Sequence, residues 1–120
     1  MKPLLAKDIT TLMERFEYFK DAEFRSCDII SPTQVELIFA VQDKARAYDW
    51  ITVALSCSLM RDAKLLEASK LHLVNMEQGI TLLHEDNFAL AIGEYTNHTN
   101  ITDSVFYIVC ENITYKEGEF

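Results

Sequence analysis

The sequence is poor in glycine and proline, the residues on which linkers and phosphate-binding loops depend. Its 120 residues contain three glycines and two prolines. Gly79, Gly93 and Gly118 stand too far apart to form a P-loop or a G-x-G-x-x-G turn, which excludes nucleotide binding of those kinds. The chain length suits one hydrophobic core, so we expect a single globular domain over residues 1–120.

Cysteine is also scarce, and no segment has the pattern of a signal peptide or a membrane span. Lys7 and Asp8 interrupt the apolar residues near the N-terminus, and no apolar run reaches the roughly 20 residues that cross a membrane. We therefore expect a cytoplasmic protein. In a reducing compartment its three cysteines are expected to be buried apolar side chains, with Cys27 as the candidate for a reactive thiol.

Lysine and arginine are absent over a long stretch of the chain, from Leu71 to Tyr115. The net charge is −8, and this stretch contains six acidic residues: Glu77, Glu85, Asp86, Glu94, Asp103 and Glu111. Acidic side chains repel phosphate backbones and attract basic proteins, so we expect no nucleic-acid binding and a basic protein partner. The alternative is that these residues only keep the protein soluble.

Patterns typical of metal, cofactor and catalytic sites are missing as well. His72, His84 and His98 belong to different segments and lack the H-x-H or H-E-x-x-H spacing of metal ligands. Cys27 has no histidine near it in the sequence to act as its base. We therefore expect no metal ion, no cofactor and no catalytic residues, and a non-enzymatic role is the preferred interpretation.

The pattern of apolar residues predicts one helix followed by a sheet. An apolar stripe at spacings of three and four predicts an amphipathic N-terminal helix: Leu5, Ile9, Leu12, Met13, Phe16 and Phe19. Period-two patterns and short apolar runs then predict strands at 24–30, 35–41, 51–60, 70–75, 80–84, 88–95 and 105–113. The segment between Met60 and Lys70 stays ambiguous, with a helical turn as one interpretation.

This pattern predicts an α+β fold, in which the helix packs on a mostly antiparallel sheet of six or seven strands. The strands at 51–60 and 105–110 are apolar on both faces, so we expect them at the centre of the sheet. The C-terminal segment, 111–120, is expected to be either an edge strand that offers its backbone to a partner or a frayed tail.

The loop between the strands at 35–41 and 51–60 is the first candidate binding site. It contains Asp43, Arg46, Tyr48, Asp49 and Trp50, which are suited to gripping a charged ligand or a protein partner. The preferred alternative is a solvated turn, with the two aspartates as turn formers and Trp50 packed at the sheet edge.

Four further residues complete the predicted binding set: Glu85, Asp86, Glu94 and Tyr95. We expect a protein-interaction module with an acidic surface, of which an inhibitor or immunity-like protein is one form. The partner is another, basic protein or a second copy of the chain. The alternative is a small-molecule binding or catalytic domain with a pocket between helix and sheet, lined by Asp43, Arg46 and Asp49. The predicted helix, followed by Phe19–Phe24, resembles the corresponding part of small bacterial immunity-type proteins. This resemblance implies no role for any residue.

Overall fold

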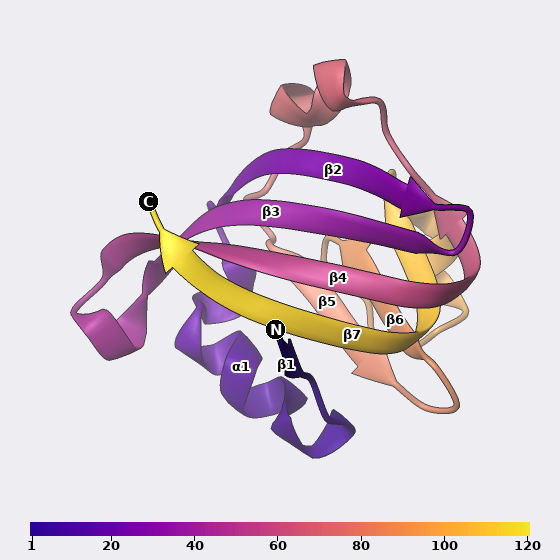
Figure 1. Ribbon diagram of the computed structural model, residues 1–120, viewed down its shortest axis with the longest axis horizontal. Coiled ribbons are helices and arrows are strands. Elements are labelled where there is room, and N and C mark those ends of the chain that lie inside the picture. Colours follow the sequence, from indigo (N-terminus) through magenta and orange to yellow (C-terminus); the bar gives the residue numbers. More distant parts are fainter.

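The computed structural model describes residues 1–120 and contains one antiparallel sheet with a short helix beside it (Figure 1). The strand order is β2-β3-β4-β7-β6-β5, and a two-residue strand, β1, pairs with β7. The bounds are β1 Lys2–Pro3, β2 Glu23–Ser31, β3 Gln34–Asp43, β4 Asp49–Lys64, β5 Ile80–His84, β6 Phe88–Ile92 and β7 Tyr107–Glu119. The predicted α+β class with a mostly antiparallel sheet is confirmed.

The two longest strands, β4 and β7, form the centre of the sheet, as their apolar character on both faces predicts. Their pairing extends from Ile51 opposite Glu119 to Lys64 opposite Tyr107. The C-terminal segment is not a frayed tail, because β7 pairs with β4 as far as Glu119. It is an edge strand over part of its length, since β1 pairs with Thr114 and Tyr115 and no strand pairs with 116–119 on that side. The alternation that suggested an edge strand also buries Ile113 in the core.

The helix is shorter than its apolar stripe. It comprises a 3₁₀ turn η1 (Ala6–Asp8), the α-helix α1 (Ile9–Arg15) and a second turn η2 (Glu17–Phe19). The stripe residues Leu12, Met13, Phe16 and Phe19 are buried, and the Phe19 ring meets Phe39 of β3 at 5.3 Å between centroids. The stripe therefore attaches the helix to the sheet, as predicted.

The segment between β4 and β5 differs from the prediction. The expected strand at 70–75 is wrong, because Ala68–Leu73 forms a 3₁₀ helix, η4, that lies against β2. Leu71 is buried there and Val74 packs partly against the core, while Leu73 is 72 % exposed, so only part of the apolar run covers the core. β6 also stops earlier than expected, at Ile92, where Gly93 adopts a φ of +112°.

The core is one large cluster of apolar side chains between the bent sheet and the helix. Cys57 and Cys110 are fully buried in it, as predicted, while Cys27 on β2 is half-buried. None of the helices has the length and apolar character needed to span a membrane.

Candidate functional site

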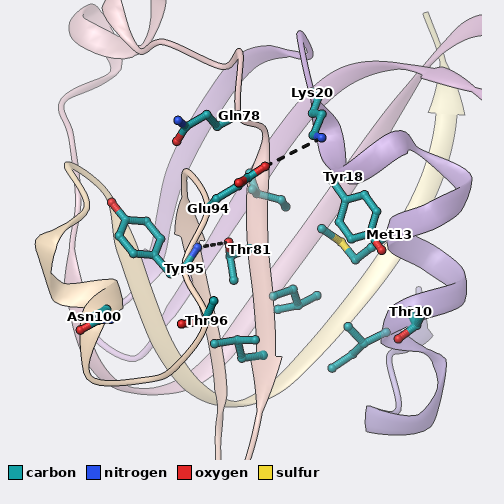
Figure 2. A pocket seen from close by; sticks show the side chains of 14 residues that line it. Thr10, Met13, Tyr18, Lys20, Gln78, Thr81, Glu94, Tyr95, Thr96 and Asn100 are labelled. Atoms are coloured by element: carbon teal, nitrogen blue, oxygen red, sulfur yellow. Dashed lines mark hydrogen bonds and ion pairs between the residues drawn. The ribbon is translucent and has the colours of Figure 1, made fainter.

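A cleft of about 550 Å³ lies between the helix and the edge of the sheet (Figure 2). One wall comes from α1 and η2, the floor from β5, and the other wall from the segment after β6. The lining residues are Ile9, Thr10, Met13, Tyr18, Lys20, Gln78, Ile80, Thr81, Leu82, Leu83, Glu94, Tyr95, Thr96 and Asn100. This volume lies within the roughly 300–1,000 Å³ typical of small-molecule sites.

The helix-side wall depends on a left-handed turn. Glu17, Tyr18 and Phe19 have φ values of 50°, 59° and 59°, and Asp21 follows with 60°. A side chain in this region costs about 1–2 kcal/mol because its Cβ approaches the carbonyl oxygen. Burial of the Phe19 ring holds the turn in place, and the turn directs Tyr18 and Lys20 towards the cleft (Figure 2).

Gly79 joins this turn to β5. Its φ is +70°, and a Cβ at this position would lie 1.9 Å from the carbonyl oxygen of Tyr18 and 2.9 Å from the nitrogen of Lys20. Asp21 N–H also donates to the carbonyl oxygen of Met76 over 2.8 Å. The turn and the start of β5 are therefore in direct backbone contact, which fixes the closed end of the cleft.

The opposite wall is organised by one hydroxyl group. Thr81 Oγ1 donates to the carbonyl oxygen of Gly93 over 2.6 Å and accepts from the backbone N–H of Tyr95 over 3.0 Å. These two bonds hold the segment after β6 against β5 (Figure 2). As a result Tyr95 and Thr96 face the cleft from the side opposite the helix.

Lys20 and Glu94 meet across the closed end of the cleft. Their nearest charged atoms, Nζ and Oε1, are 3.9 Å apart, and the side chains are 49 % and 69 % exposed. Such an exposed pair contributes at most about 1 kcal/mol to stability. It is therefore a loose contact that a charged ligand group can replace.

The floor of the cleft exposes unpaired backbone groups. Gly93 N–H donates to the oxygen of Gly79, and Glu85 N–H donates to the oxygen of Asn87, which fixes the hydrogen-bonded positions of the β5–β6 pair. Because these positions alternate along an antiparallel pair, the N–H and C=O groups of Ile80 and Leu82 point away from β6. They have no hydrogen-bond partner in the protein.

The predicted loop residue Asp43 lies elsewhere, in a buried ion network. It is 0 % exposed and accepts from Arg15 Nε at 2.9 Å and Nη2 at 2.6 Å, from Ala45 N–H at 2.9 Å, and pairs with Arg46 at 3.3 Å. Glu117 on β7 accepts from Arg15 as well. Hydrogen bonding from Arg15 holds the pKa of Asp43 below its ordinary value, outweighing the opposite effect of burial.

The interpretation of this loop as a turn is right in part. Asp43 is a turn former beside Arg46, since its side chain accepts from the backbone N–H of Ala45, but it is buried and not solvated. A pocket between helix and sheet exists, but Asp43, Arg46 and Asp49 do not line it. The network lies on the other face of α1, where Thr11 and Arg15 face Lys44.

The remaining residues of the loop are exposed. Tyr48 is 46 % exposed with a φ of 65°, and Asp49 is also exposed, opposite Asp43 in the register of β3 and β4. Trp50 is 42 % exposed, and its ring lies 5.7 Å from that of Phe120. Trp50 does not pack at a sheet edge, because β4 is a central strand.

The other predicted binding residues occupy two places. Glu85 and Asp86 form the exposed turn between β5 and β6 and have no cationic partner. Glu94 and Tyr95 line the cleft. The sequence did not indicate Tyr18, Lys20 and Thr81 as site residues, since no motif marks a left-handed turn of ordinary residues.

Several acids of the cation-poor half of the chain are paired with cations from elsewhere. Glu94 meets Lys20, and Glu111 accepts from Arg61 over 2.9 Å. Glu117 pairs with both Arg15 and Arg46. These contacts reduce the excess of negative charge over this part of the surface. Glu85 and Asp86 at the β5–β6 turn stay unpaired, as do the exposed Glu77 and Asp103.

The thiol groups and the histidines form no assembled centre. Burial, together with the charge of Asp28, raises the pKa of Cys27 to about 11, which disfavours the reactive thiolate. No three His, Cys, Asp or Glu side chains gather closely enough to hold a metal ion. Comparison with protein-family models, curated proteins and solved structures gives no match.

Proposed function

We propose that the protein is a binding protein that holds part of a partner molecule in the cleft between α1 and β5. The observation that carries this proposal is the combination of an apolar floor with a polar rim. The partly exposed Ile9 and Leu83 supply apolar surface, while Tyr18, Thr96 and other polar side chains surround it. Specific ligand sites have this composition, because apolar area gives affinity and a few polar groups fix orientation.

Backbone strain beside the cleft supports the same proposal. Strained residues persist only where the surrounding structure holds them, and they concentrate at ligand sites and switches. In this chain three consecutive residues, Glu17 to Phe19, are left-handed, and the middle one lines the cleft. A turn of this kind contributes little to the core beyond Phe19, so the placement of Tyr18 and Lys20 is its main structural result.

The experiment is a ligand screen with a matched pair of variants. Thr10 and Thr11 are adjacent, exposed threonines of α1, but only Thr10 lines the cleft. A library of small organic fragments and a library of displayed random dodecapeptides are screened against the wild-type protein, with binding followed by amide chemical shifts. Binders are expected to shift the amides of Lys20, Thr81 and Tyr95, to be lost with Thr10→Trp and to be retained with Thr11→Trp. If the binders keep their affinity for both variants, the proposal is disproved.

A second candidate function is docking of a basic protein on the acidic turn between β5 and β6. The observation in its favour is that Glu85 and Asp86 are adjacent, exposed and unpaired, within the stretch that lacks cations. A basic protein captured at low salt should be released as salt rises, since surface attraction is screened. Capture should also be lost with E85Q/D86N and retained with the exposed control Glu67→Gln.

A further inference from the structure

The floor of the cleft offers hydrogen-bonding groups that the protein leaves unused. The side chains of Ile80 and Leu82 are buried in the core, while the N–H and C=O groups that these residues direct away from β6 have no partner in the protein. An open strand edge of this kind is a template for pairing with another chain. These groups therefore indicate what kind of molecule fits the cleft.

The spacing of these groups matches a polypeptide main chain. Equivalent positions on one edge of a strand repeat every two residues, or about 6.8 Å. Four consecutive residues, Ile80 to Leu83, line the cleft although their side chains alternate between the two faces of the sheet. The cleft therefore follows the edge of β5, and an extended chain in it can donate to and accept from that edge.

The charges at the closed end indicate a cationic group on the ligand. Lys20 and Glu94 are the only charged residues that line the cleft. The surroundings are acidic, because Glu17 and Asp21 belong to the same turn as Lys20, and Glu77 follows the residue that Asp21 contacts. A cation from the ligand therefore meets a favourable potential at Glu94, where the loose contact with Lys20 is the only competitor.

We propose that the cleft binds an extended segment of a partner protein, which pairs through its main chain with the outer edge of β5 and places a lysine or arginine on Glu94. This inference rests on the proposed function and specifies the ligand of the same site. Apolar side chains of the segment contact Ile9 and Leu83, and the segment displaces Lys20 from Glu94. The mode of recognition is the addition of a strand to a sheet edge, which combines main-chain bonds with side-chain pockets.

The test uses peptides selected from the random dodecapeptide library against the full-length protein and lost with Thr10→Trp. Each main-chain nitrogen of a selected peptide is methylated in turn, and affinity is measured by calorimetry. Affinity should fall about tenfold at every second position and change little at the positions between, because only alternate amides of a strand face β5. A uniform response, or no response, would overturn the inference.

Two protein variants test the charged end. Glu94→Gln should lower the affinity for cation-bearing peptides about fivefold. Lys20→Met should raise this affinity by a few-fold, because it removes the residue that competes for Glu94. Replacing the lysine or arginine of the peptide by norleucine should abolish both effects. If the wild-type protein and both variants bind both peptides with equal affinity, the assignment of the cation to Glu94 is overturned.

Hydrogen exchange provides a readout that does not depend on affinity. On peptide binding the amide of Leu82 should exchange at least about tenfold more slowly, because its N–H gains a partner. An unchanged Leu82 amide in a saturated complex would contradict strand addition. If organic fragments occupy the cleft but no peptide does, this inference fails and the proposed function stands; if nothing occupies the cleft, both fail.

Discussion

Arg15 of α1 and Asp43 at the end of β3 form a two-point contact, in which Nε lies 2.9 Å from Oδ1 and Nη2 lies 2.6 Å from Oδ2. This geometry is the strongest form of ion pair, since two parallel bonds fix both distance and orientation. Arg46 and Glu117 extend it into a network that joins the helix, the β3–β4 loop and β7. The loop that looked like a binding site in the sequence is therefore a point of attachment for the helix.

The first prediction concerns the stability that this attachment provides. Asp43→Asn should lower the free energy of unfolding by about 2–4 kcal/mol, because it removes the buried one of the two anions that Arg15 and Arg46 share and leaves only Glu117. The matched control is Asp49→Asn, an exposed aspartate opposite Asp43, which should change it by less than about 0.5 kcal/mol. Urea denaturation measures the free energy of unfolding of both variants. Equal losses in the two variants would contradict the stabilising role of the network.

The second prediction is a pH dependence with a defined sign. The pKa of Asp43 is lower in the folded protein than its unfolded value of about 3.9. The network therefore contributes its full stability above that unfolded value and loses it as the pH falls towards the folded pKa and below. Between neutral pH and strong acid, the wild-type protein should lose more unfolding free energy than Asp43→Asn, measured by urea midpoints. Parallel pH curves would exclude Asp43 as the titrating group.

The third prediction concerns the backbone contact between Gly79 and the left-handed turn. Gly79→Ala should cost about 3 kcal/mol or more, because the new Cβ meets the oxygen of Tyr18 and the φ is positive. Gly118→Ala is the comparison, since its Cβ would meet only a side-chain atom, the hydroxyl of Thr52 at 2.6 Å, and its φ is not in the left-handed region. The Tm of Gly79→Ala should lie well below that of Gly118→Ala. The reverse order would refute the contact between Gly79 and the turn.

The fourth prediction concerns the wall that Thr81 holds. Thr81→Val keeps the shape of the side chain but removes two hydrogen bonds, so we expect a loss of about 1–2 kcal/mol. The amide of Tyr95 should also exchange faster, because it loses its acceptor. Thr96→Val, an exposed change in the same segment, should leave both measurements close to the wild-type values. An unchanged Tyr95 amide in Thr81→Val would show that other contacts hold this wall.

The fifth prediction concerns the strain at the start of the left-handed turn. Asparagine tolerates positive φ better than glutamate, so Glu17→Asn should raise the free energy of unfolding by about 0.5–1 kcal/mol. The same substitution at Glu14, inside α1, should lower it by a few tenths of a kcal/mol, about the difference in helix propensity. Denaturation of both variants under one condition tests this opposite sign.

Much of the sheet could be predicted from the sequence. Strands with one buried face alternate apolar and polar residues, and the order of residues shows this period of two directly. The patterns of β3 and β4, and the apolar character of β4 and β7 on both faces, gave their existence and their central place. The prediction for Lys70–Asn75 failed because its apolar residues resemble a strand locally, while in the fold the segment lies against β2 as the 3₁₀ helix η4.

The candidate site was much less predictable. Its helix-side wall requires a left-handed turn at Glu17–Phe19, where no glycine or asparagine signals a positive φ. Its closed end requires contact between Gly79 and Tyr18, which are sixty-one residues apart in the sequence. Local patterns of apolar and polar residues contain no information about such long-range contacts. Glu94 and Tyr95 were expected to bind a partner, but as members of an acidic surface and not as one wall of a cleft.

The ion network also sets an order of events during synthesis on the ribosome. Glu117 follows Arg15 by 102 residues, so at typical elongation rates it appears roughly 5–20 s later. Within that interval β3 and β4 are made before β7, so the apolar stripe of the helix can meet Phe39 of β3 while Glu117 is still missing. We therefore expect the helix to pack on the first strands early, and its ion network to be completed only when β7 has been made.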